Sequence, residues 1–235
     1  MAGTLHLLPA WLSEGVPPDA VVPAAVLERI RSLDAFVVED AKSARAWLAA
    51  CRHPKPIREI AFAELNEHTP AGAISALLDP VAAGRDMGLL SEAGLPAIAD
   101  PGAALVAAAH ARGIVVVPHV GPSSILLALM ASGLEGQRFR FVGYLPADAA
   151  ARRNAIGELE RQSSKARETQ VFIETPYRND AVLADLLQSC RPSTRIAVAA
   201  ELTSPREWIR MDSVEKWRAS PATIGKRPAI FLLLA

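Results

Sequence analysis

The sequence predicts an α/β protein of two α/β domains, the first around a mainly parallel five-stranded sheet and the second around a mixed sheet. Two observations lead to this prediction. Short apolar runs alternate with helix-like segments through the first half of the chain, as in successive βα units. After residue 138 the expected strands follow one another more closely, which is typical of partly antiparallel pairing. We place the boundary at the proline-rich turn near residues 118–122, which gives domains over residues 1–118 and 119–235.

Five strands are expected in the first half. Each is a short run of apolar or β-branched residues that stops near a proline, a glycine or a carboxylate. The expected strands are Thr4–Leu8, Ala35–Val38, a weaker Ile57–Phe62, Met87–Leu90 and Ile114–Val117. The expected helices are Ala24–Leu33, Ala44–Cys51, one from Ala71 that Pro80 ends or kinks, and Ala103–Ala111.

The second half begins with an apolar helix. Gly121-Pro122-Ser123-Ser124 opens it, and Gly133 closes it after Ser132. The strands expected after it are Phe139–Gly143, Gln170–Glu174, Arg195–Ala200, Trp208–Asp212 and Pro228–Leu234. Two further helices are expected over Ala149–Lys165 and Asp180–Ser189.

Composition limits the classes of protein that fit. The chain has 235 residues, 51% of them hydrophobic, so it can bury a substantial core. It contains no unbroken apolar run of about 18 residues, and its first residues lack the basic start of a signal peptide. We therefore expect a cytoplasmic protein that does not enter a membrane. Cys51 and Cys190 have no spacing typical of metal ligands, so no metal site is expected.

Net charge is zero, which argues against a protein that grips long nucleic acids by overall electrostatics. Between Arg138 and Arg167, however, seven basic residues face only three acidic ones. This local surplus fits docking of a phosphate-rich partner, and it fits an ordinary solvated helix face equally well.

The segment Ser91–Gly102, with the sequence SEAGLPAIADPG, carries the strongest functional signal of the chain. It follows an apolar strand and combines two glycines, two prolines and two carboxylates before a helix begins. In open α/β sheets, ligands bind beyond the carboxyl ends of the strands. The segment therefore predicts a loop that binds a small ligand, and the alternative is a well-made turn.

Seven segments together resemble one family, the tetrapyrrole-methylase superfamily of S-adenosylmethionine methyltransferases. Within it, the chain is most similar to the bacterial branch that methylates ribose 2′-O atoms in small-subunit ribosomal RNA. The resemblance covers nearly the whole chain. The segments are LHLLPAWL, VVEDAKS, LLSEAGLPAIADPG, VVVPHVGPSS, FRFVGYLP, FIETPYR and AAELT.

The resemblance implies two domains with S-adenosylmethionine in the cleft between them, a homodimer, and RNA of the small ribosomal subunit as the substrate. Methionine's amino group needs acceptors, its carboxylate needs amides such as a helix N-terminus offers, and adenine needs an apolar slot. The cofactor contacts that the resemblance implies are Leu12, Glu92, Leu95, Ser123, Ser124, Ile125, Ile173 (or Phe172) and Ala200.

The chain departs from the usual pattern of that branch at three loops. Pro9–Gly15, with the sequence PAWLSEG, stands where the branch usually has Pro-Ile-Gly-Asn-Leu. Glu39–Ser43 replaces an Asp-Thr-Arg-x-Thr signature, and Glu92–Pro96 replaces Asp-Ala-Gly-Thr-Pro. These changes remove a polar loop contact, a hydroxyl and an arginine on the substrate side.

Methyl transfer to a ribose hydroxyl benefits from a general base, because the neutral hydroxyl is a poor nucleophile. We predict Glu39, Asp40 and Glu174 as the catalytic candidates, since each follows an expected strand. Three classes of function fit the sequence. These are a methyltransferase acting on RNA, a methyltransferase acting on a small molecule such as a tetrapyrrole, and a non-catalytic relative that binds the cofactor.

Overall fold

The structure is a computed structural model that describes residues 2–235. The chain divides into two compact units, one ending at Ser123 and the other spanning Ser124–Ala235. Each unit contains one five-stranded sheet covered by helices. The first sheet is parallel and the second is mixed, so the predicted fold class is confirmed.

The sheet of the first unit has the strand order β3-β2-β4-β1-β5, and all neighbouring strands are parallel. Parallel sheets are normally buried on both faces, which explains why the central strands read as continuous apolar runs. Every residue of β2 and β4 is buried. The strands are β1 (Thr4–Leu7), β2 (Ala35–Val38), β3 (Ala61–Glu64), β4 (Met87–Leu90) and β5 (Val115–Pro118).

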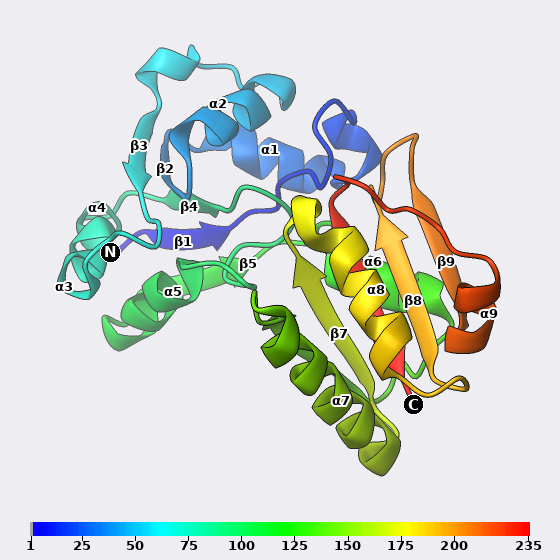
Figure 1. Ribbon diagram of the computed structural model, residues 1–235. Helices are drawn as coiled ribbons and strands as arrows, with labels where there is room; N and C mark the ends of the chain where they lie inside the picture. The colour runs from blue at the N-terminus through cyan, green and yellow to red at the C-terminus, as the bar shows by residue number, and fades with distance from the viewer. Residues whose placement is uncertain (1) are drawn as a thin grey trace. The chain divides into compact units, whose positions relative to one another are not determined.

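Helices pack on both faces of this sheet (Figure 1). α1 (Ala24–Ser32) and α2 (Ala41–Ala50) cover one face, where Phe36 and Trp47 belong to a common apolar core. α5 (Gly102–Ala111) covers the other face. The short helices α3 (Ala71–Ile74), η3 (Ser75–Leu78) and α4 (Asp79–Ala82) join the core on that second face.

Three expected elements of this unit differ in the structure. The strand expected over Ile57–Phe62 is shifted, because residues Ile57–Glu59 form the short helix η2 after Pro56 and pairing begins only at Ala61. Helix α2 begins at Ala41 and not at Ala44, since Asp40 caps it. Pro80 lies in the first turn of α4, where a missing amide hydrogen costs nothing, so the expected kink appears as a chain of three short helices.

The sheet of the second unit has the strand order β6-β7-β10-β8-β9. β6 and β7 are parallel, and the other three neighbouring pairs are antiparallel. The strands are β6 (Phe139–Tyr144), β7 (Thr169–Glu174), β8 (Arg195–Ala200), β9 (Trp208–Ser213) and β10 (Ala229–Leu234).

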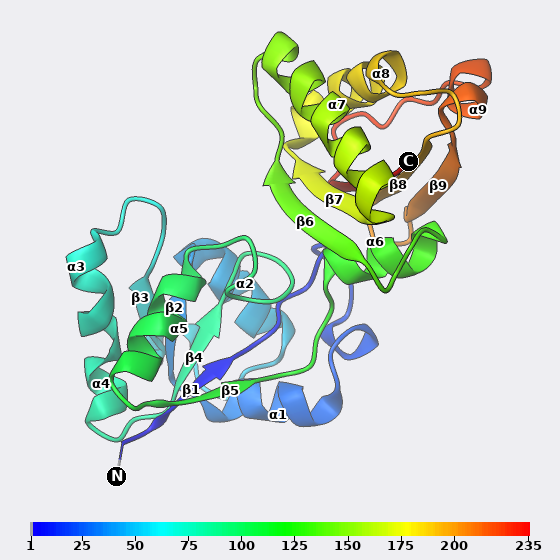
Figure 2. The ribbon, with the colours of Figure 1, turned by 90° about the horizontal axis from the view of Figure 1, so that it is seen from below.

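One face of this sheet carries α7 (Ala149–Ala166) and α8 (Asn179–Ser189), and α6 (Ser124–Ser132) lies on the other face (Figure 2). The stacked rings of Phe172 and Phe231 are fully buried in the core beneath α7 and α8. The short helices α9 (Val214–Ala219) and η4 (Pro176–Arg178) are not predicted by the sequence patterns. No helix within residues 2–235 combines the length and the apolar character needed to cross a membrane.

Candidate functional site

Three loops of the first unit meet at the carboxyl ends of β1, β4 and β5. These strands are neighbours in the sheet and run parallel, so their carboxyl ends share one edge. The amide of Ala10 donates to the carbonyl of Gly94 at 2.8 Å, and the amide of Gly94 donates to the carbonyl of Trp11 at 3.3 Å. The amide of His119 donates to the carbonyl of Leu7 at 3.0 Å. Backbone hydrogen bonds therefore hold the end of β1 and the loop after it against the loops that follow β4 and β5.

Two glycines permit this close approach. A Cβ atom on Gly121 would lie 2.1 Å from Cβ of Pro9, so only glycine fits there. Gly94 has a φ of +74°, and a Cβ on it would lie 3.2 Å from a methyl carbon of Leu12. A methyl carbon of Leu95 lies within 3.5 Å of the position a Gly121 Cβ would take. The structure thus brings Leu12 and Leu95, two predicted cofactor contacts, to one junction of loops.

A cavity of about 520 Å³ opens beside this junction. Its volume lies within the range of about 300–1,000 Å³ typical of small-molecule sites. Trp11 lines the cavity, and its ring packs against the buried ring of Trp47 with the centroids 5.2 Å apart. The lining residues include three predicted site residues, Leu12, Asp40 and Glu92; the others are Trp11, Glu14, Lys42, Ser43, Ala46 and Ala93.

A second cavity, of about 630 Å³, lies at the ends of β2, β3 and β4. Glu39 and Glu92 both line it, and Glu92 lines the first cavity too. The backbone amide of Glu92 donates to Oε2 of Glu39 at 3.4 Å. Burial raises the pKa of Glu39, and the nearby carboxylates of Glu92, Asp100 and Asp40 act in the same direction. Glu39 therefore holds a proton more readily than an exposed glutamate.

Asp40 is in a different state, although it is the next residue. It caps α2 by accepting hydrogen bonds from the backbone amide and the hydroxyl of Ser43, both at 2.7 Å. These two hydrogen bonds lower the pKa of Asp40. A carboxylate held in this way is a weak base and a good helix cap.

Asp100 shapes the loop after β4, and sequence reasoning did not single it out. Its carboxylate accepts from the amide of Ala97 at 2.9 Å and from the amide of Gly102 at 2.7 Å. Ala97 and Ala99 have φ values of 65° and 61°, a left-handed conformation that alanine rarely adopts. An aspartate two residues before a glycine is a recognisable turn signal, and it was available in the sequence as Asp100-Pro101-Gly102.

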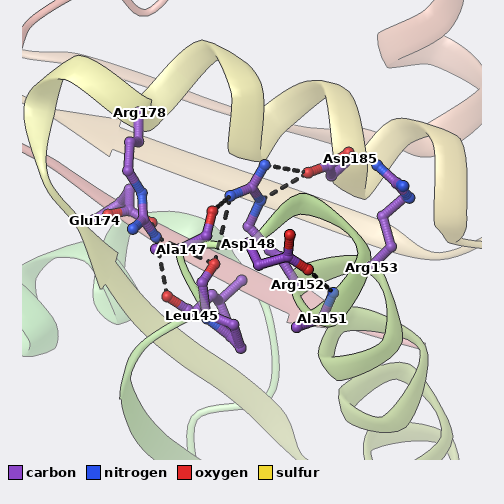
Figure 3. Close-up of polar contacts among 10 residues, drawn as sticks. Leu145, Ala147, Asp148, Ala151, Arg152, Arg153, Glu174, Arg178 and Asp185 are labelled. Atoms are coloured by element: carbon purple, nitrogen blue, oxygen red, sulfur yellow. Dashed lines mark hydrogen bonds and ion pairs between the residues drawn. The ribbon is translucent and has the colours of Figure 1, made fainter.

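In the second unit, Glu174 lies at the carboxyl end of β7 with a fully buried side chain. Arg178 forms an ion pair with one of its carboxylate oxygens (Figure 3). The amide of Thr175 donates to the other oxygen at 2.7 Å, and the hydroxyl of Thr175 donates to it at 3.1 Å. Both oxygens of Glu174 are therefore engaged, which is the arrangement of a structural anchor.

The same anchor holds the loop that follows β6. Arg178 also donates to the backbone carbonyl of Leu145 at 2.9 Å. From the other side, Arg152 donates to the carbonyl of Ala147 at 2.9 Å and forms a buried ion pair with Asp185 (Figure 3). Two arginines from different elements thus fix one short loop through its carbonyl groups.

The remaining predicted cofactor contacts lie at strand ends of the second unit and at the start of α6. In the register of the sheet, Glu174 of β7 and Ala200 of β8 both pair with Ala229 of β10, so these two strand ends flank the start of β10. Ile173 is half-buried and directly precedes Glu174. Ser124 and Ile125 form the first turn of α6 and are also half-buried, as is Ser123 at the end of the first unit.

No group of three or more histidine, cysteine, aspartate or glutamate side chains in residues 2–235 is arranged to hold a metal ion. Cys51 and Cys190 are both buried, and burial raises the pKa of each thiol to about 12. These thiols are therefore protonated and unreactive at neutral pH.

The first unit defines the class of fold: an open α/β sheet whose loops gather at the carboxyl ends of parallel strands, which is where such sheets bind ligands. A family model described as Tetrapyrrole (Corrin/Porphyrin) Methylases matches residues 15–216 of the chain. The chain belongs to this family, and the resemblance seen in the sequence is confirmed.

Curated relatives carry the name ribosomal RNA small subunit methyltransferase I. The one from Vibrio cholerae is 34% identical over 184 residues, which cover 78% of this chain and 61% of that protein. The one from Xylella fastidiosa is 39% identical over 181 residues, covering 77% of this chain and 63% of that protein. The matched segment thus spans a little over three-fifths of the length of these relatives.

Solved structures share the fold at lower identity. The methyltransferase CobJ has a TM-score of 0.64 at 17% identity, with 98% of this chain and 94% of that chain covered. Uroporphyrin-III C-methyltransferase of Thermus thermophilus, in complex with S-adenyl homocysteine, has a TM-score of 0.58 at 18% identity, with 99% and 97% covered. At such identities the likeness supports the two-domain fold and no more.

Proposed function

We propose that this chain binds S-adenosylmethionine and transfers its methyl group to RNA of the small ribosomal subunit. The observation that carries the proposal is the junction of loops at Gly94 and Gly121, beside a cavity of about 520 Å³. The names of the curated relatives support RNA as the acceptor. Arg152 is buried against Asp185, but Arg138, Arg140 and Lys165 of the basic segment are exposed, which is consistent with RNA binding.

The residues present fit the cofactor. The apolar side chains of Leu12 and Leu95 offer a slot for the adenine ring, and Glu92 offers carboxylate oxygens to the methionine amino group. We assign Ser123 and Ser124, at the start of α6, to the methionine carboxylate, since amides and hydroxyls at a helix N-terminus bind anions. Ile125, Ile173 and Ala200 complete the proposed set of contacts. When bound, the cofactor supplies a methyl group on a positively charged sulfur.

Among the three catalytic candidates, we assign the role of general base to Glu39. Its pKa is raised, and a base works best when its pKa approaches the working pH. Asp40 is occupied as a helix cap and keeps a lowered pKa, so we assign it to the wall of the cavity. Glu174 is occupied by Arg178 and Thr175, so we assign it a positioning role in the second unit.

Calorimetric titration with S-adenosylhomocysteine tests the cofactor site. The wild-type protein is expected to bind it, and Gly121→Val is expected to abolish binding, because the new side chain collides with Pro9. Gly72→Ala is the matched control in the same unit, since a Cβ there meets nothing within 4 Å. Absence of binding by the wild-type protein would overturn the proposed function.

Transfer of a labelled methyl group to small ribosomal subunits that lack the modification tests the acceptor. We expect transfer by the wild-type protein and a rate at least about 100-fold lower for Glu39→Gln, as is usual when a general base is removed. Cofactor binding by Glu39→Gln is expected to persist. Labelling of porphyrinoid precursors without labelling of RNA would instead favour a small-molecule acceptor.

We further propose that the protein acts in the cytoplasm as a homodimer. Leu126 and Met130 support the dimer, because they lie four residues apart on α6 and are 47% and 78% exposed. Exposed apolar side chains on one helix face are typical of an interface between subunits. Sedimentation velocity is expected to give a dimer for the wild-type protein and a monomer for Met130→Glu; a wild-type monomer contradicts the proposal.

A further inference from the structure

A groove on the second unit combines positive charge with open space. Its volume is about 350 Å³, and it lies along α7 beside the turn that joins α8 to β8. Three of its residues, Gly157, Arg161 and Lys165, are four positions apart in turn and therefore share one face of the helix. The other lining residues are Glu160, Ser164 and Arg191.

The only carboxylate among these lining residues is already engaged. Oε1 of Glu160 accepts from the backbone amide of Arg191 at 2.8 Å and from the hydroxyl of Thr194. Nε of Arg191 lies 3.6 Å from the same oxygen, and the Arg191 side chain is 57% exposed. Glu160 thus holds the turn in place, and the outer part of the groove keeps a positive charge.

The two cations of α7 differ in their availability. Arg161 is paired with Glu158 on the helix surface, with its Nε 2.9 Å from a carboxylate oxygen. Lys165 is exposed, and no described carboxylate forms an ion pair with it. Lys165 and the exposed part of Arg191 are therefore the groups best placed to meet an added anion.

Gly157 is a second and independent sign of a binding groove. It lies in the middle of an 18-residue helix, where glycine costs about 1 kcal/mol relative to alanine. Neither packing nor backbone geometry requires it, because a Cβ there would meet nothing within 4 Å and its φ is not left-handed. A helix glycine of this kind leaves room for a ligand to approach the backbone.

We propose that this groove of the second unit docks the sugar–phosphate backbone of the RNA substrate. The inference rests on the proposed function for the identity of the RNA. A lysine, an exposed arginine and the Ser164 hydroxyl are groups that bind phosphate oxygens. The lining residues include no apolar side chain that a peptide partner would bury, so an acidic protein segment is the less suitable occupant.

Fluorescence anisotropy with a short labelled single-stranded RNA, without cofactor, tests the proposal over a range of salt concentrations. We expect binding by the wild-type protein to weaken as salt rises. Lys165→Ala is expected to lower the magnitude of the slope of log K against log salt by about 0.7. Relative to the wild type, the variant should then bind about fivefold more weakly at 0.1 M salt than it does at 1 M salt.

Gly157→Gln tests the open space without changing the charge. Glutamine favours helix more than glycine does, so this variant is expected to fold at least as well as the wild type and to bind RNA more weakly. Lys226→Ala is the matched control, because Lys226 is an exposed lysine of the same unit outside the groove. It removes the same charge and is expected to bind RNA nearly as well as the wild type.

Unchanged RNA binding by both Lys165→Ala and Gly157→Gln would overturn the proposal, as would an equal loss in Lys226→Ala. Competition by poly-glutamate at the same charge concentration as RNA would overturn the assignment to nucleic acid. The experiments distinguish failure of the proposed function from failure of the groove proposal. If only the proposed function is wrong, cofactor binding or methyl transfer is absent while RNA binding still depends on Lys165.

Discussion

Two glutamates at strand ends, Glu39 after β2 and Glu174 at the end of β7, have opposite surroundings. Glu39 lies near other carboxylates, and no described lysine or arginine forms an ion pair with it. Burial raises the pKa of Glu39. Glu174 is more deeply buried, yet Arg178 and Thr175 engage both of its oxygens. Burial alone therefore does not decide the role of a carboxylate. What decides it is whether a compensating charge and hydrogen bonds are buried with it.

The largest expected effect is the loss of Glu174. Glu174→Gln leaves the guanidinium of Arg178 without its counter-charge in a largely buried place, which should lower the free energy of unfolding by about 3 kcal/mol. Urea denaturation measures this. Glu39→Gln is the matched change and is expected to leave stability at pH 7 unchanged or slightly higher. A loss below about 1 kcal/mol for Glu174→Gln would contradict the anchor role.

A smaller effect is expected for Asp100, which holds the loop after β4. Asp100→Ala removes hydrogen bonds to the amides of Ala97 and Gly102 and should cost about 2 kcal/mol. Because the loop also contributes to a cavity, cofactor affinity should fall with stability. Thermal denaturation and calorimetric titration measure the two effects. An unchanged melting temperature would show that the loop keeps its shape without the carboxylate.

Ala97 should respond in the opposite direction. Its left-handed backbone is strained for alanine, so Ala97→Gly is expected to raise the free energy of unfolding by up to about 1 kcal/mol. Ala107→Gly, at an exposed position inside α5, should lower it by about the same amount. Chemical denaturation of both variants gives the comparison. If both substitutions destabilise equally, the strain at Ala97 contributes nothing to stability.

The sequence predicted the strand ends well and the partners of the side chains poorly. Met87–Leu90 forms β4 within its predicted bounds, because a run of apolar residues followed by glycines and prolines is a local signal. β3 was misplaced, since it is an edge strand with half-exposed residues and no apolar run marks it. Asp40 was interpreted only as a catalytic candidate, although Asp40 and Ser43 also have the spacing of a helix cap.

In the candidate site, too, the sequence predicted the loops better than the partners of the side chains. The glycines and prolines of the loop after β4 indicated a binding loop, and Leu12 and Leu95 do meet there. The contact of Glu39 with the amide of Glu92 joins residues 53 positions apart, and no local pattern predicts it. Glu174 and Arg178 are four residues apart, so their pairing was visible in the sequence, but the burial that makes it an anchor depends on the whole second unit.

The smallest expected effect is a pH dependence that separates Glu39 from Asp40. The pKa of Glu39 is raised in the folded protein above its ordinary value of 4.5, mainly by burial, so its ionisation disfavours folding as pH rises through the raised pKa. Any stability gained by Glu39→Gln should therefore be largest at pH 7 and disappear by about pH 4.5.

Asp40 has the opposite sign. Its pKa is lowered below its ordinary value of 3.8 by the hydrogen bonds from Ser43, so its contribution to stability is present above that pH and is lost as pH falls through the lowered pKa. Asp40→Asn should therefore be less stable than the wild type at pH 7, and the difference should shrink as pH falls below 3.8. Denaturation curves for both variants across this range give the two trends. If the stability difference from the wild type had the same sign for Glu39→Gln and Asp40→Asn, the surroundings of the two carboxylates would not explain their stability effects.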